Sequence, residues 1–185
     1  MSTALLVVDM LHDFIDGALA NPAAKPTIEP TARLLDAARR AGWSVIYGND
    51  AHQPGDLEFA VFGEHALAGS PGGAVIPELT PADGDIVVPK RFYSTFTDTD
   101  LDASCRVHRI DHLVLAGQHT DCCCRHTSYD AFLRGITVTV VSDATCVYAP
   151  ADPATTEDRQ QQALQYLQRY YNARIADTDT VLTQG

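Results

Sequence analysis

The chain has 185 residues, 45% of them apolar, and a formal net charge of −11. This length predicts a single domain over residues 1–185, because it can fill one core but is too short for two ordinary domains. The acidic charge repels polyanions, which argues against nucleic acid or an anionic membrane as a partner. No segment approaches the roughly 20 apolar residues that span a bilayer, and the opening STALLVVDM lacks the basic residues of a signal peptide. We therefore expect a cytoplasmic protein.

Five cysteines occur in the chain, and three of them are consecutive. Such an odd, unspaced set predicts neither a disulfide framework nor a CxxC zinc pair. Reduced thiols are the expectation.

Short aliphatic runs alternate with segments of helical periodicity along the chain. The expected strands are 4–8, 43–47, 86–88, 112–116, 136–141 and a short 173–176. The expected helices are 28–41, 101–108, the cysteine-bearing segment that leads to residue 134, and 156–171, with loops over 11–26 and 53–82. This alternation predicts an α/β fold with a mostly parallel six-stranded sheet, right-handed crossovers and helices on both faces.

Polar residues follow several of these strands. Asp9, Asp50, His52 and Lys90 each come at or just after a strand end, and the cysteines follow the fourth strand. Ligands of such sheets bind at the carboxyl edge, so these side chains are expected to converge there.

A cysteine at a helix start is a candidate nucleophile, because the unpaired N–H groups and the helix dipole lower a thiol's pKa. Asp9 could act as its base and Lys90 as a balancing cation. No GxSxG elbow is present and no GxGxxG follows the first strand, which disfavours a serine hydrolase and a dinucleotide enzyme.

Several pieces of the chain occur together in one known family. They are ALLVVDMLHDF, NDAH, HALAGSPGG, VVPKRFYSTF, VLAGQHTDCC and RHTSYDAFLRG. In these pieces the sequence resembles the isochorismatase-like cysteine hydrolases, the superfamily of nicotinamidase and N-carbamoylsarcosine amidohydrolase, over nearly its whole length. The resemblance implies the family's three-layer fold with a Rossmann-like strand order. It selects Cys123 as nucleophile, because Thr120 and Asp130 flank it at the family's spacing.

The resemblance also implies a catalytic triad of Asp9, Lys90 and Cys123. It implies a cis peptide between Gln118 and His119, and an oxyanion hole made by the N–H groups of His119 and Cys123. His119 is bulkier than the Ala of nicotinamidases, so it is a candidate substrate contact that departs from that pattern. The other cysteines are expected to be small hydrophobic residues.

In the nicotinamidase branch an Asp and two His residues bind a divalent metal, and Asp50, His52 and His65 match them, with Ser70 in place of a family Thr. Two imidazoles and a carboxylate suit zinc. Phe14 and Phe62 fall where the family places ring-stacking aromatics, and Tyr93 is a further candidate substrate contact. The alternative for Asp50 and His52 is a simple hydrogen bond in a polar loop.

The expected function is cysteine-dependent hydrolysis of a small carboxamide through a thioester, with nicotinamide as the default substrate and no organic cofactor. Another amide remains open as substrate, either a carbamoyl compound or an antibiotic lactam such as a streptothricin-type ring. A non-catalytic binding module on the same fold also remains open. The family resemblance further implies a homo-oligomer.

Overall fold

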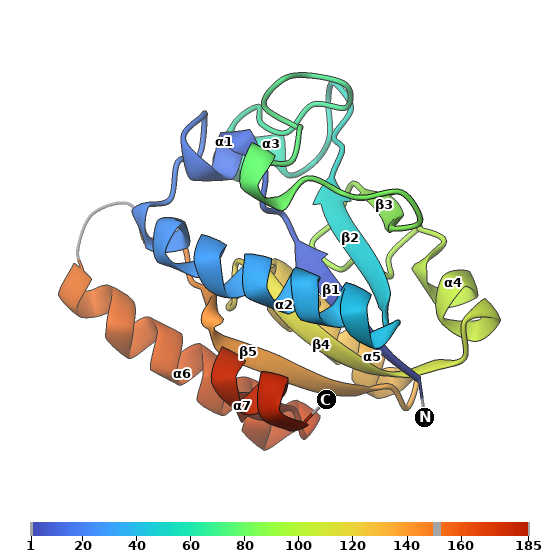
Figure 1. The fold of residues 1–185 in the computed structure, drawn as a ribbon. Helices are drawn as coiled ribbons and strands as arrows, with labels where there is room; N and C mark the ends of the chain where they lie inside the picture. The colour runs from blue at the N-terminus through green and yellow to red at the C-terminus, as the bar shows by residue number, and fades with distance from the viewer. Residues whose placement is uncertain (1, 150–152, 185) are drawn as a thin grey trace.

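The computed structural model describes residues 2–149 and 153–184, which form one six-stranded sheet flanked by helices (Figure 1). The strands are β1 (Ser2–Val8), β2 (Ser44–Asp50), β3 (Ile86–Lys90), β4 (Ile110–Gln118), β5 (Thr137–Cys146) and β6 (Arg174–Ala176). Every neighbouring pair is parallel and the order is β3-β2-β1-β4-β5-β6. The predicted α/β fold and its Rossmann-like strand order are confirmed.

Helices cover both faces of this sheet because alternate strand residues point to opposite sides. Leu5 and Val7 of β1 pack toward α2 (Ile28–Ala41) and α7 (Thr178–Gln184), which lie in front in Figure 1. Leu6 and Val8 pack toward α4 (Leu101–Val107), α5 (Cys123–Leu133) and α6 (Pro153–Tyr171). The central strand β1 is therefore buried on both sides, which explains its continuous aliphatic sequence.

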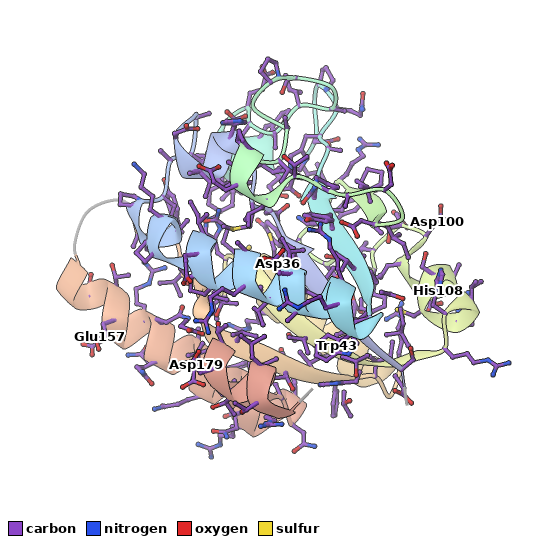
Figure 2. All side chains as sticks on the ribbon, viewed as in Figure 1. Asp36, Trp43, Asp100, His108, Glu157 and Asp179 are labelled. Carbon is purple, nitrogen blue, oxygen red and sulfur yellow. The ribbon has the colours of Figure 1, made fainter. Side chains whose placement is uncertain are left out.

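The outer sides of the helices carry the acidic surface. Asp36 of α2, Glu157 of α6 and Asp179 of α7 are exposed (Figure 2). The helix α2 is capped by Gly42, whose left-handed φ of 71° turns the chain so that the Trp43 N–H donates to the Ala38 carbonyl at 2.9 Å. Among the described helices, none combines the length and the hydropathy needed to cross a membrane.

The structure corrects several predicted boundaries. The predicted loop 11–26 contains the short helix α1 (His12–Ile15) and most of the 3-10 helix η1 (Pro22–Thr27). The connection 53–82 contains α3 (Phe59–Phe62) and η2 (Pro77–Leu79), and α7 was not predicted. The strand β5 runs on to Cys146 because its last residues pair with Gly117 and Gln118 after an irregularity in register.

Candidate active site

Asp9 lies at the carboxyl end of β1, where the chain makes a sharp change of direction. Its φ is 52°, a left-handed conformation that Asp tolerates better than most residues, and its N–H donates to the Gly48 carbonyl at 3.2 Å. Its Oδ1 accepts a 2.7 Å hydrogen bond from the Asp50 N–H. These contacts direct the carboxylate toward the neighbouring strand ends.

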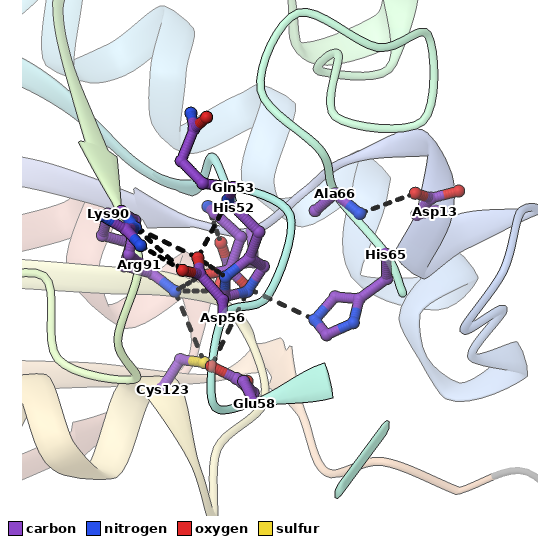
Figure 3. Close-up of polar contacts among 12 residues, drawn as sticks. Asp13, His52, Gln53, Asp56, Glu58, His65, Ala66, Lys90, Arg91 and Cys123 are labelled. Atoms are coloured by element: carbon purple, nitrogen blue, oxygen red, sulfur yellow. Dashed lines mark hydrogen bonds and ion pairs between the residues drawn. The ribbon is translucent and has the colours of Figure 1, made fainter. Parts of the chain in front are cut away.

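Lys90 ends β3 and its side chain is buried among acidic groups. Its Nζ lies 2.8 Å from Asp9 Oδ2, pairs with Asp50 Oδ1, and lies 3.7 Å from Cys123 Sγ (Figure 3). Burial opposes its charge, but attraction to Asp50 and Asp9 outweighs burial and raises the pKa of Lys90 well above its usual range. Lys90 is therefore a fixed ammonium that joins the other two members of the expected triad.

Asp9 has the properties of a proton acceptor. Burial and the nearby charge of Asp50 raise its pKa to about 7, although Lys90 acts in the opposite direction. A carboxyl group with a pKa near neutrality can both take and return a proton. Asp9 and Cys123 also lie close together, with a carboxylate oxygen and the sulfur within 4.8 Å of each other.

Cys123 is the first residue of α5, at the positive end of the helix dipole. The hydrogen bond with the Cys122 thiol and burial raise the pKa of Cys123 well above its usual value, against the effect of Lys90. The resting sulfur is therefore a thiol that needs a base. Asp9 can supply that base.

Two backbone donors next to the sulfur have no acceptor in the described part of the chain. The peptide bond between Gln118 and His119 is cis, at the position where it was expected. The N–H groups of His119 and Cys123 donate to no acceptor among the described residues, whereas those of Thr120, Cys122 and Cys124 all do. Two free N–H groups beside a buried sulfur are the arrangement that holds an oxyanion.

Gly117 makes this arrangement possible. Its φ is 107°, and a Cβ at this position would lie 2.0 Å from the Val8 carbonyl oxygen. The backbone of β4 therefore approaches β1 as only glycine allows. One residue on, Gln118 Nε2 donates to the Asp9 carbonyl at 3.1 Å, and Gln118 Oε1 accepts from Asn21 at the same distance.

Beside the triad, four side chains form a cluster suited to a metal ion. They are Asp50, His52, Glu58 and His65, whose ligand atoms all lie within 4.8 Å of one another. His52 Nε2 lies 3.6 Å from Asp50 Oδ2 and 3.7 Å from Glu58 Oε2. Asp50 Oδ2 and the Nε2 atoms of both histidines are buried without a hydrogen-bond partner among the described residues. Because buried polar atoms are normally paired, these three fit an ion between them.

The outer nitrogens of the two histidines are held in place. Asp56 Oδ2 lies 3.0 Å from His52 Nδ1, and the Gly63 carbonyl accepts from His65 Nδ1 at 2.8 Å. Arg91 pairs with Asp56 in turn (Figure 3). Such partners fix the tautomer that leaves Nε2 free for a metal, as is usual for metal-binding histidines.

A small cavity of about 20 Å³ borders Cys123. Phe14, Phe62 and His119 line it as expected, together with Tyr148. Tyr93 is not among the residues that line it, and its ring packs against His126 with 5.2 Å between centroids. A substrate contact at Tyr93 stays a prediction.

The structure adds residues that the sequence did not indicate. Glu58 joins the metal cluster, but the loop also carries Asp56 and Glu64, so spacing alone could not select it. Cys122, expected to be a small hydrophobic residue, is half-buried and lines the cavity. The hydrogen bond with Cys123 lowers the pKa of Cys122 to about 6, aided by His126 and opposed by burial.

Comparisons with known proteins place the chain in a family. The isochorismatase domain model matches residues 3–180. A ureidoacrylate amidohydrolase from Rhizobium rhizogenes is 32% identical over 77% of this chain and 70% of its own length. A probable inactive nicotinamidase from Arabidopsis thaliana is 33% identical over 80% of this chain and 83% of its own.

Solved structures agree with these matches. The crystal structure of N-carbamoylsarcosine amidase from Thermoplasma acidophilum is 40% identical, with a TM-score of 0.87 and coverage of 97% of this chain and 98% of that one. The pyrazinamidase/nicotinamidase of Streptococcus mutans is 29% identical, with a TM-score of 0.85 and coverage of 94% and 99%. The chain belongs to the isochorismatase family.

Proposed function

We propose that the protein hydrolyses a small, non-peptide carboxamide by way of a thioester on Cys123. The observation that carries this proposal is the buried Lys90, whose Nζ lies 2.8 Å from Asp9 Oδ2 and 3.7 Å from Cys123 Sγ beneath a cavity. Relatives named as amidohydrolases and amidases support the reaction class.

In the first half of the reaction the Asp9 carboxylate takes the thiol proton and the sulfur attacks the carbonyl carbon. The carbonyl electrons move to oxygen, and the N–H groups of His119 and Cys123 stabilise the resulting oxyanion. When the intermediate collapses, the C–N bond breaks and protonated Asp9 gives its proton to the departing nitrogen. Ammonia leaves, and the acyl group remains on sulfur as a thioester.

In the second half Asp9 accepts a proton from water while the water oxygen adds to the thioester carbonyl. The C–S bond then breaks, and Asp9 returns the proton to Cys123 as the carboxylic acid leaves. Lys90 remains charged throughout and balances the negative charge that moves between sulfur and carboxylate.

We also propose that Asp50, His52, Glu58 and His65 hold a divalent ion, with zinc as the best fit to two imidazoles and two carboxylates. The unpartnered buried atoms of Asp50, His52 and His65 support this. A bound ion would provide a Lewis-acidic attachment point for a substrate nitrogen. Because nicotinamide carries such a ring nitrogen, we propose a nicotinamide-like aromatic amide as the specific substrate.

The test is ammonia release from nicotinamide, N-carbamoylsarcosine, ureidoacrylate and a lactam, with and without a chelator. Release from at least one amide is expected. Nicotinamide turnover that is indifferent to complete metal removal would contradict the metal-dependent form. Binding of amides without any turnover would instead favour a non-catalytic binding module. One relative is itself named as a probable inactive nicotinamidase.

A further inference from the structure

The imidazole of His119 has a free hydrogen-bonding atom at the candidate active site. The ring lies edge-on to Phe14 and to Tyr148, with centroid distances of 5.6 and 5.3 Å. Its Nε2 is buried and has no partner among the described residues, although the side chain lines the cavity above Cys123. A buried polar atom without a partner is unfavourable, and a ligand that pairs with it removes that cost.

This ring is uncharged near neutral pH. Burial between the aromatic rings lowers the pKa of His119 to about 4, and the carboxylate of Asp121 opposes this only partly. A neutral imidazole offers one N–H and one lone pair. It therefore suits an uncharged polar atom, such as an amide or a ring nitrogen, better than it suits an anion.

The cavity offers no counter-ion for a carboxylate. Among the described residues that line it, no lysine or arginine is present, and the side chains that can carry a negative charge are Asp50, Glu58, Cys122 and Cys123. The nearby Lys90 is already paired with Asp9 and Asp50. With Asp9, Asp50 and Glu58 ionised, their three negative charges would equal the three positive charges of Lys90 and a divalent ion, so the site would hold no surplus positive charge.

We propose that His119 is a specificity-determining residue, which hydrogen-bonds a second polar atom of an uncharged aromatic amide within a cavity that rejects carboxylate-bearing amides. The inference rests on the proposed function and names the substrate class of the same site. It separates this chain from enzymes acting on ureido acids, since ureidoacrylate and N-carbamoylsarcosine both carry a carboxylate.

The test measures binding in a Cys123→Ala background, where no ligand is turned over. Calorimetry gives the Kd values of benzamide and the three pyridinecarboxamides, which differ in the presence and position of one ring nitrogen. It also gives those of isophthalamide and 3-carbamoylbenzoate, which are nearly equal in size and differ in charge. His119→Phe removes Nε2 but keeps a ring against Phe14 and Tyr148, and His119→Gln restores a hydrogen-bonding group.

At least one pyridinecarboxamide is expected to bind about tenfold more tightly than benzamide, the ratio that roughly 1.4 kcal/mol gives. His119→Phe should reduce this ratio below about threefold and His119→Gln should restore most of it. Isophthalamide should bind at least about tenfold more tightly than 3-carbamoylbenzoate, since an unpaired carboxylate is costly to bury. Unchanged ratios in His119→Phe, tighter binding of the carboxylate, or no binding of any uncharged amide would each overturn the proposal.

These outcomes are separate from those of the amidase proposal. Wild-type turnover of an amide combined with ratios indifferent to His119 leaves the amidase standing and removes the role of His119. If the affinity ratios change with His119 but the wild type turns over no amide, the amidase proposal fails and the binding role of His119 stands.

Discussion

At the scale of single residues, the proposed reaction depends on one sulfur among five. Cys123 is the cysteine in contact with Lys90, at 3.7 Å, and it begins a helix beside two free N–H groups. Cys122 shares the cavity, whereas Cys124 and Cys105 are buried in the core. Position, more than thiol acidity, distinguishes the proposed nucleophile.

Cys123→Ala is expected to lower kcat for ammonia release by at least about a thousandfold, as loss of a nucleophile does in other covalent hydrolases. Cys105→Ala is the matched control, because it removes an equally buried thiol of α4 that is remote from the cavity. A Cys123→Ala enzyme within tenfold of wild type would rule out the thioester route.

Cys122 is expected to alkylate as a thiolate with a midpoint near pH 6. Labelling by iodoacetamide should rise about tenfold per pH unit below this midpoint and level off above it, because the thiolate is the reactive form. Cys123→Ala removes the hydrogen bond that lowers this pKa and should move the midpoint toward the ordinary value of about 8.5. Mass spectrometry of the tryptic peptide Ile110–Arg125, which contains Cys122, measures the midpoint in both proteins. A rate still rising through pH 8 in the wild type would contradict this reading.

The sequence predicted the three residues of the proposed triad, but not every side chain that lines the cavity or joins the metal cluster. Asp9, Lys90 and Cys123 could be anticipated because each follows or ends a strand of one parallel sheet, and the family motif selected Cys123. Glu58 and Tyr148 could not, because they come from loops whose paths depend on tertiary packing. Tyr93 follows Lys90 closely in sequence, yet its ring packs against His126 and not into the cavity.

At the scale of elements, the site depends on how closely β4 approaches β1. Gly117→Ala would place a Cβ 2.0 Å from the Val8 oxygen, in a left-handed conformation. We expect a loss of more than about 3 kcal/mol in the free energy of unfolding, because overpacking adds to backbone strain.

Gly55→Ala is the control for Gly117→Ala. Its φ of 89° carries similar backbone strain, but a Cβ there meets nothing within 4 Å. Its expected cost is about 1–2 kcal/mol. Urea denaturation measures both variants, and equal losses would show that the approach of β4 to β1 is not tightly constrained.

Strand and helix order could be predicted at this scale because aliphatic runs and helical periodicity are local features. The helix α2 was predicted at its observed bounds, since Gly42 marks its end. The extension of β5 through Ser142 and Asp143 could not be predicted, because it depends on pairing with Gly117 and Gln118. The one-turn helices α1 and α3 lie within segments rich in Gly and Pro, where the periodic signal is absent.

At the scale of the whole molecule, the metal cluster should couple ion binding to stability. Buried and unpartnered ligand atoms in the ion-free protein are a cost that binding removes. Zinc at 100 times its Kd should raise the free energy of unfolding by about 2.7 kcal/mol. Thermal denaturation with zinc and with chelator measures the shift.

His65→Ala should abolish most of that shift, and His108→Ala, which alters an exposed histidine of the same chain, should preserve it. An equal zinc shift in both variants would remove His65 from the set of ligands.

In the proposed reaction the acyl group passes through Cys123, and trapping the thioester shows whether it does. Wild-type enzyme mixed with a turned-over amide is quenched in acid, and the peptide Ile110–Arg125 is sequenced by mass spectrometry. A mass increase equal to that of the acyl group is expected on Cys123, and it should be absent in Cys123→Ala. An acyl group on Cys122, or steady turnover without any acylated cysteine, would contradict it.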